Sequence, residues 1–209
     1  MQDVFIYGAG GHCKVTINLL SCLDGYRIVG ILDDAPTTVD SSCLEYEILG
    51  EIASLNKDDY PNCSVVIGVA KPAYRRMIWE KVTALGYESI TLIHPSACIA
   101  HNVTIGSGTM ILANAIVNVG AKIGKGVLIN NGAIVEHDCV IGDFVHVASG
   151  ARMAGRVEIG NGAFIGIGAI IIEFVKVGEN AIVGAGAVVI NGVPAGATVV
   201  GNPAKVIKK

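Results

Sequence analysis

Aromatic residues are scarce in this chain of 209 residues, at 5% of the total, and charged residues make up only 16%. The 15 basic and 18 acidic residues give a formal net charge of −3, and the basic residues are dispersed rather than interleaved with aromatics. The basic patch and stacking surface of nucleic-acid-binding proteins are therefore missing, and we expect no nucleic-acid partner. No apolar run approaches the roughly 20 residues that a bilayer-spanning helix needs, so no membrane span is expected.

The six cysteines show no CxxC spacing, which disfavours a metal knot or a disulfide framework; they are Cys13, Cys22, Cys43, Cys63, Cys98 and Cys139. The N-terminus opens directly into an apolar stretch, without the basic segment and cleavage site of a signal peptide. Reduced thiols are typical of the cytosol, and a cytoplasmic protein is the expectation.

An aliphatic residue recurs at every sixth position from Ile93 to Val189, and all but Met153 are β-branched. A small residue, mostly alanine, stands two positions before most of them. Neither the helical period of 3.6 nor the strand period of 2 gives a strict period of six. A coil with flat sides does, because each short strand then contributes one inward aliphatic residue and each corner a small one.

A second period of eighteen is marked by a glycine directly after its aliphatic residue, at Gly106, Gly124, Gly142, Gly160 and Gly178. Three sixes therefore complete one coil, and the glycine recurs at the same corner of a triangular prism. The sequence predicts a parallel β-helix over residues 91–209, including a C-terminal tail. The pattern [Ile/Val]-Gly-x-x-small-x resembles that of the hexapeptide-repeat acyltransferases, and this resemblance implies a left-handed β-helix.

The first 90 residues form a different domain, in which the count by sixes fails. Buried strands are predicted at residues 4–7, 27–32 and 64–69, with helices after the glycine turn of residues 8–12 and over residues 73–85. Alternating strands and helices indicate a small α/β domain with a parallel sheet, about half of a dinucleotide fold. A tight turn without a ligand and a nucleotide site both fit Gly8-x-Gly10, because Cys13 replaces the third glycine of the fingerprint. The small size of the domain favours a single nucleotide over a dinucleotide.

The fusion of the two domains resembles one subgroup of the hexapeptide enzymes, the sialic acid O-acetyltransferases and the UDP-4-amino-sugar N-acetyltransferases of the bacillosamine pathway. The similar segments are Gly-Ala-Gly-Gly-His at 8–12, Leu-Asp-Asp at 32–34, Ile-Gly-Val-Ala at 67–70 and Gly-Asn-Pro-Ala-Lys at 201–205. The resemblance implies acetyl-CoA as co-substrate, and it implies that the UDP part of the acceptor is held by Gly10, Gly11, His12, Asp33, Asp34 and Gly68.

Two histidines, His137 and His146, interrupt the repeat at positions that are not inward aliphatic slots, so both are expected to be exposed and to project outward or along an edge. His137 lies between two carboxylates, Glu136 and Asp138. Acetyl transfer from a thioester to an amine needs a base near its working pH, and an imidazole beside a carboxylate meets that need. A catalytic role is therefore favoured over a structural one.

By resemblance, His137 is the general base and Asp138 the acid that increases its basicity, while Glu136 remains the rival carboxylate. The resemblance also implies that His146, Ile167 and Ala185 contact acetyl-CoA, with Ala185 where some relatives have glycine. His137 and His146 are nine residues apart, half a coil, and so belong to different faces of one prism. We therefore expect a homotrimer with its active sites between subunits.

The leading prediction is an acetyl-CoA-dependent N-acetyltransferase acting on the 4-amino group of a UDP-linked 2-acetamido-4-amino-trideoxy sugar. Sugar O-acetylation of the sialic acid type uses the same fold and donor and stays open. A γ-type carbonic anhydrase needs three converging histidines. His94 and His101 lie coils away from His137, so this zinc enzyme is disfavoured and no metal is expected. A non-catalytic sugar-binding β-helix is the remaining alternative.

Overall fold

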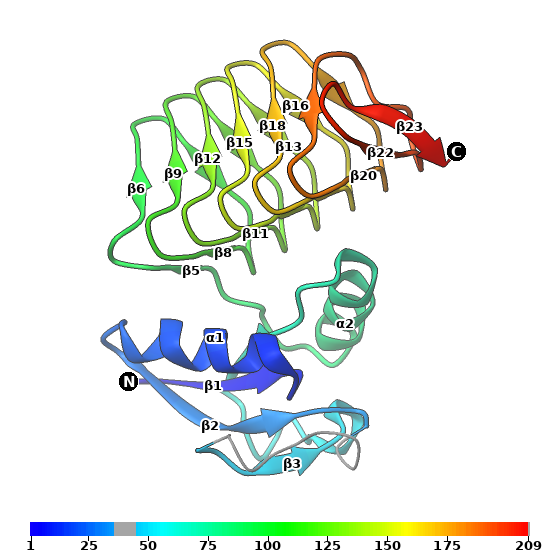
Figure 1. Cartoon of the computed structure of the whole chain (residues 1–209). Helices are drawn as coiled ribbons and strands as arrows, with labels where there is room; N and C mark the ends of the chain where they lie inside the picture. The colour runs from blue at the N-terminus through cyan, green and yellow to red at the C-terminus, as the bar shows by residue number, and fades with distance from the viewer. Residues whose placement is uncertain (36–44, 209) are drawn as a thin grey trace. The chain divides into compact units, whose positions relative to one another are not determined.

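The computed structural model describes residues 1–35 and 45–208, and Cys43 lies outside them. The chain divides into two compact units, Met1–Leu92 and Ile93–Lys209. The first contains the helices and the second is built from short strands (Figure 1).

The N-terminal unit is a four-stranded parallel sheet with the strand order β3-β2-β1-β4. Its elements are β1 (Gln2–Tyr7), α1 (Gly11–Ser21), β2 (Tyr26–Leu32), β3 (Ile48–Gly50), a 3₁₀ turn (Ile52–Ser54), β4 (Ser64–Ile67) and α2 (Pro72–Ala84). The three predicted strands and both helices are confirmed. The sequence did not indicate β3, which is three residues long.

The strand order reverses between β1 and β4, since β2 and β3 lie on one side of β1 and β4 on the other. In open parallel sheets, ligands bind beyond the carboxyl ends of the strands at such a switch point. The glycine turn follows β1, Asp33 follows β2 and Gly68 follows β4. All the predicted nucleotide-binding residues therefore lie at this edge of the sheet.

The second unit is a left-handed parallel β-helix with three sheets of short strands, which confirms the predicted fold class. One sheet contains β7 (Thr104–Ile105), β10 (Lys122–Ile123), β13 (Val140–Ile141), β16 (Glu158–Ile159) and β19 (Lys176–Val177). The second contains β6 (Cys98–Ile99), β9 (Ile116–Val117), β12 (Ile134–Val135), β15 (Arg152–Met153), β18 (Ile170–Ile171) and β21 (Val188–Val189). The third contains β5 (Leu92–Ile93), β8 (Met110–Ile111), β11 (Leu128–Ile129), β14 (His146–Val147), β17 (Phe164–Ile165), β20 (Ile182–Val183), β22 (Thr198–Val200) and β23 (Lys205–Lys208), the last antiparallel.

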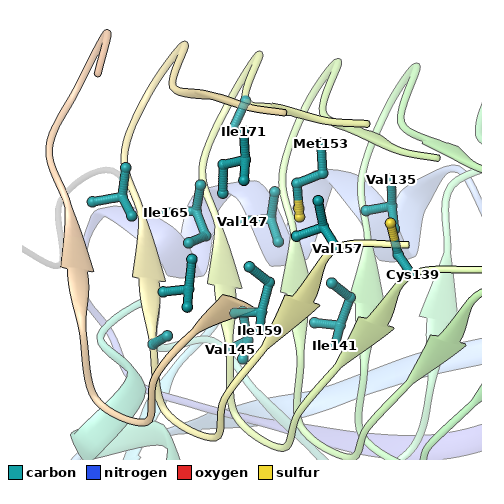
Figure 2. Packing of buried hydrophobic residues seen from close by; sticks show 14 of the residues in the cluster. Val135, Cys139, Ile141, Val145, Val147, Met153, Val157, Ile159, Ile165 and Ile171 are labelled. Carbon is teal, nitrogen blue, oxygen red and sulfur yellow. The ribbon is translucent and has the colours of Figure 1, made fainter. Parts of the chain in front are cut away.

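The interior of the β-helix is a single column of aliphatic side chains (Figure 2). All seventeen residues of the six-residue series belong to it; those from Ile111 onward are buried, and Ile93, Ile99 and Ile105 are partly buried. Each buried aliphatic side chain contributes about 1.5–3 kcal/mol relative to exposure. The small residues two positions earlier, such as Ala133 and Ala151, are buried as well, because they fill the narrow corners.

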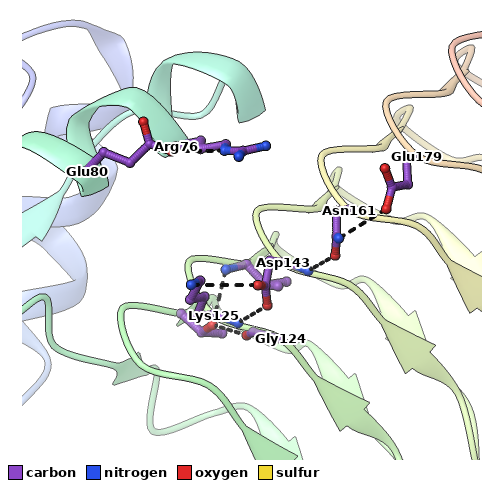
Figure 3. Close-up of polar contacts among 9 residues, drawn as sticks. Arg76, Glu80, Gly124, Lys125, Asp143, Asn161 and Glu179 are labelled. Carbon is purple, nitrogen blue, oxygen red and sulfur yellow. Dashed lines mark hydrogen bonds and ion pairs between the residues drawn. The ribbon is translucent and has the colours of Figure 1, made fainter.

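The glycine series stacks coil upon coil at one corner, as the period of eighteen predicts. A Cβ on Gly124 would lie 2.7 Å from the amide nitrogen of Asp143 and 2.8 Å from the carbonyl carbon of Gly142, so no side chain fits. A ladder of polar groups runs beside these glycines (Figure 3). Asp143 accepts a hydrogen bond from the amide of Lys125 at 3.0 Å, and Asn161 accepts one from the amide of Asp143 at 2.8 Å. Residues eighteen apart are therefore direct neighbours along the prism.

Five cysteines are described, and all are free: Cys13, Cys63 and Cys139 are buried, while Cys22 and Cys98 are exposed. Across residues 1–35 and 45–208, none of the helices has the length and apolar character needed to cross a bilayer.

Candidate functional site

The candidate catalytic pair lies in the turn that follows β12. His137 and Asp138 form this turn, and Asp138 has a φ of 58°, a left-handed conformation that aspartate tolerates better than most residues. The side chains of His137 and Asp138 are 48% and 53% exposed. The predicted outward orientation of His137 is therefore confirmed.

The imidazole of His137 is paired with the carboxylate of Asp138, with Nδ1 3.0 Å from Oδ2. The hydrogen bond from His137 lowers the pKa of Asp138 and outweighs the opposing effect of desolvation, and the charges of His137 and Arg156 lower it further. An ionised carboxylate can only accept, so Nδ1 is the donor in this pair, and in a neutral imidazole Nε2 then keeps its lone pair. This tautomer is the one that a general base at Nε2 requires.

Glu136, the rival carboxylate, is engaged elsewhere. Its Oε2 accepts a hydrogen bond from the side-chain amide of Asn118 at 2.8 Å, one coil earlier. The structure thus assigns the imidazole partner to Asp138, a choice that the sequence left open.

Two further residues of this corner, Gly155 and Arg156, were missed by the sequence analysis. A Cβ on Gly155 would overlap Nε2 of His137 and lie 2.5 Å from Cε1, so the imidazole occupies the space above this glycine. The Nε of Arg156 lies 3.6 Å from Oδ2 of Asp138. Both residues stand eighteen positions after the catalytic pair, and applying that period to polar residues would have found them.

The expectation that His146 is an exposed histidine is wrong. It is the first residue of β14 and retains only 6% exposure. Its ring packs edge-on against Phe164 with the centroids 5.0 Å apart, and its Nε2 lies 3.4 Å from the side-chain nitrogen Nδ2 of Asn130. The side chain points away from the interior aliphatic column, but its neighbour in register on β17 is an aromatic ring that covers it.

His137 and His146 belong to different sides of the prism, since His137 follows β12 in the six-stranded sheet and β14 lies in the eight-stranded one. One chain therefore does not bring them together. Ile167 is 63% exposed in the turn after β17, and Ala185 is exposed one coil further on, where the amide of Gly186 donates to the carbonyl of Ile167 at 2.8 Å. These two predicted acetyl-CoA contacts are direct neighbours on the surface.

In the N-terminal unit, both predicted acidic residues have partners within the chain. The carboxylate of Asp33 accepts hydrogen bonds from the amides of Ala9 and Ala35, each at 2.8 Å, and so holds the glycine turn against the end of β2. Asp34 forms an ion pair with Lys81 at 2.5 Å. Burial alone would raise the pKa of Asp34, but the bonds from Lys81 and Tyr7 outweigh it and lower the pKa.

A cavity of about 310 Å³ lies beside this ion pair, lined by Asp34, Glu51, Ile52, Ala53, Lys81, Ala84 and Leu85. Its walls combine apolar atoms with a few charged groups, which is the usual composition of a small-molecule site.

His12 is the second residue of α1 and is neutral, because burial, with the charge of Arg75 in addition, lowers its pKa to about 4. Its Nε2 has no hydrogen-bond partner among the described residues. Gly10 and Gly11 have open space where a Cβ would lie. Gly68 is different: its amide donates to the carbonyl of Tyr7 at 2.8 Å, and a Cβ there would crowd Ile6.

Over residues 1–35 and 45–208, no group of three or more histidine, cysteine, aspartate or glutamate side chains is arranged to hold a metal ion. The three converging histidines of a γ-type carbonic anhydrase are not assembled in this part of the chain.

Comparisons with known proteins match both units. Residues 3–82 match the PglD N-terminal domain, and residues 120–155 and 156–191 match the bacterial transferase hexapeptide (six repeats). The chain is 36% identical over 113 residues to a UDP-N-acetylbacillosamine N-acetyltransferase of Bacillus subtilis. That match covers 54% of this chain and 52% of the relative, about half the length of each.

Two solved structures are similar over nearly the whole chain. The acetyltransferase domain of PglB from Neisseria gonorrhoeae, in complex with acetyl coenzyme A, is 35% identical with a TM-score of 0.90, and the match covers 99% of both chains. PerB from Caulobacter crescentus, in complex with CoA and GDP-perosamine, is 33% identical with a TM-score of 0.90, over 98% of this chain and 96% of that one. The chain therefore belongs to the hexapeptide-repeat acyltransferases, in the group of PglB- and PerB-type acetyltransferases.

Proposed function

We propose that this protein is an acetyl-CoA-dependent N-acetyltransferase that acts on the 4-amino group of a UDP-linked 2-acetamido-4-amino-trideoxy sugar. The observation that carries the proposal is the exposed pair of His137 and Asp138, with Nδ1 3.0 Å from the carboxylate. The relatives support the class of substrate, because one is named for UDP-N-acetylbacillosamine and another was solved with CoA and GDP-perosamine.

In the proposed reaction, the sugar amine attacks the thioester carbonyl of acetyl-CoA, a C–N bond forms, and the C–S bond then breaks. Nε2 of His137 accepts the proton that the amine loses, and the CoA thiolate leaves. Asp138 stabilises the resulting imidazolium and keeps the required tautomer. A well-placed general base of this kind contributes about 10²–10⁴-fold in rate.

For the donor, we propose that His146, Ile167 and Ala185 line the acetyl-CoA site. Ile167 and Ala185 are exposed neighbours on successive coils, which suits a long pantetheine arm running along the prism. Because His137 and His146 lie on different sides of one prism, the proposal includes a homotrimer in which neighbouring subunits complete the site. A form that sediments as a monomer and keeps full activity would contradict this part.

For the acceptor, we propose that the nucleotide binds at the carboxyl ends of β1, β2 and β4, which carry Gly10, Gly11, His12, Asp33, Asp34 and Gly68. The open space at Gly10 and Gly11, directly at the start of α1, suits phosphate groups near helix-terminal amides. The neutral His12 can offer a hydrogen bond but no charge to them.

The test is an acetyl-CoA assay that follows release of the CoA thiol with UDP-4-amino sugars, a GDP-linked 4-amino sugar, free amino sugars and sialic acid as acceptors. We expect turnover with UDP-linked amines and a product amide that resists hydroxylamine. An ester product from sialic acid would establish O-acetylation instead.

The matched variants are His137→Ala and His101→Ala. Both histidines lie in turns of the same column, two coils apart, but His101 is assigned no function. We expect His137→Ala to lose at least about 10²-fold in kcat while still binding CoA, and His101→Ala to keep its activity. Equal turnover in the two variants would remove His137 from the mechanism.

A further inference from the structure

Arg156 lies directly beyond Asp138 along the prism, one coil later. Its backbone amide donates to the carbonyl of His137 at 2.9 Å, and its φ of 60° repeats the left-handed conformation of Asp138. Its guanidinium is placed over the ring of Phe174, one further coil on, with 5.7 Å between Cζ and the ring centroid. Arg156 is therefore braced between an aromatic ring and the carboxylate of the candidate catalytic pair.

One carboxylate oxygen faces both the imidazole and the guanidinium. Oδ2 of Asp138 lies 3.0 Å from Nδ1 of His137 and 3.6 Å from Nε of Arg156. We propose that Arg156 is a positioning residue that holds Oδ2 in this shared arrangement and limits how basic Asp138 makes the catalytic imidazole. The proposal rests on the proposed function, because it assigns His137 as the base.

The other charged groups around the imidazole are few. On its own coil these are Asp138 and Glu136, whose carboxylate is engaged by Asn118. The preceding coil presents the neutral Asn118, Val119 and Gly120 at this corner, and the following coil presents Gly155, Arg156 and, on β15, Arg152. His101 and Glu173 lie two coils away on either side in the column of His137. Among the arginine and lysine side chains of residues 1–35 and 45–208, Arg156 is the one that forms an ion pair with Asp138.

The sign of the effect follows from the charges. Asp138 favours the imidazolium, and the guanidinium positive charge beside it offsets part of that effect. Removing the guanidinium should therefore make His137 take up its proton at a higher pH. Because the imidazole and the guanidinium both contact Oδ2 of Asp138, the charge of Arg156 acts on His137 from roughly 6 Å. In a water-like dielectric, one unit charge at that distance shifts a titration midpoint by about half a pH unit. The side chain of Arg156 is 59% exposed, so the shift should shrink in high salt.

The test compares Arg156→Met, Arg156→Lys and a control, Lys176→Met, in the full-length protein. The control removes another exposed ion pair, Lys176 to Glu158 at 2.9 Å, on a different sheet. The titration midpoint of His137 is measured by NMR of the labelled imidazole, and the acidic limb of kcat/KM against pH is measured alongside it.

We expect both midpoints to rise by about half a pH unit in Arg156→Met, and by much less in Arg156→Lys, which keeps the charge. Neither should move in the control, and the rise should fade at 1 M salt. An unchanged or lowered midpoint in Arg156→Met would overturn the proposal, as would an equal rise in Arg156→Lys. The NMR titration needs no substrate, so it decides this proposal even if no acceptor is turned over, and turnover with an unmoved midpoint would leave the proposed function intact.

Discussion

Gly155 offers a way to displace the catalytic imidazole without disturbing the packed interior. In Gly155→Ala, the new Cβ would overlap Nε2 of His137 and lie 2.5 Å from Cε1. Ordinary van der Waals contact needs at least about 3.5 Å, so the imidazole must move by about 1 Å. The side chain of His137 is 48% exposed and free on its solvent side, so it can move at little cost in folding free energy.

A misplacement of about 1 Å at the reacting group costs on the order of 10²-fold in rate. We therefore expect Gly155→Ala to lower kcat by about 10²-fold and to change the free energy of unfolding by less than about 1 kcal/mol. The assays are acetyl transfer from acetyl-CoA and denaturant unfolding.

The matched control is Gly160→Ala, on the next strand-to-turn junction. There the new Cβ would lie 2.5 Å from the amide nitrogen of Glu179 and 2.8 Å from the carbonyl carbon of Gly178, which are backbone atoms that cannot rotate away. We expect this variant to lose about 1–3 kcal/mol of stability while its kcat at low temperature is retained. If Gly155→Ala keeps wild-type kcat, the imidazole above Gly155 is not the base and the assignment of the site is refuted.

Three further outcomes are expected. Asp138→Asn should keep the left-handed turn but lower kcat by about 10²-fold or more, because the amide donates to Nδ1 of His137 and leaves the proton on Nε2; wild-type kcat in this variant would exclude the pairing as the source of basicity. Met153→Ala should cost about 2–5 kcal/mol in denaturant unfolding, since this side chain is 1% exposed in the column, and a loss below 1 kcal/mol would mean that the column closes around the cavity. Folding keeps the pKa of His12 at about 4 against a reference of 6.5, so the unfolded chain binds the proton first as pH falls. Stability present above pH 6.5 should decrease by about 3 kcal/mol towards pH 4, as followed by the fluorescence of Trp79, the single tryptophan, and His12→Gln should be less dependent on pH.

The interior of the β-helix was predictable residue by residue because its period of six is strict. Each aliphatic residue from Ile93 to Val189 occupies the position that the period assigns. The same count gave the outward direction of His146 but not its surroundings, because covering by Phe164 depends on the residue one coil later. A one-dimensional period states which way a side chain points, whereas burial depends on its neighbours along the prism.

The catalytic corner was predictable only in part for the same reason. His137 and its flanking carboxylates are adjacent in sequence, but Asn118, which engages Glu136, and Arg156, which pairs with Asp138, each lie eighteen residues from their partner. In the N-terminal unit, the glycine turn and the acidic pair were visible, but Asp34 binds Lys81, 47 positions away, through a contact that only the folded α/β unit creates.

The glycine corner has a consequence for how such a chain can change length. Deleting six residues from the β-helix would keep an aliphatic residue at every inward position, yet all later residues would turn by one side of the triangle. The glycines would then face side chains instead of one another, and His137 would meet a different partner from the following turn. Deleting eighteen residues removes one complete coil, and both the stacked glycines and the neighbours of His137 return to register. The hydrophobic interior therefore tolerates deletions of six residues, whereas the polar contacts at the corners are kept only by deletions of eighteen residues.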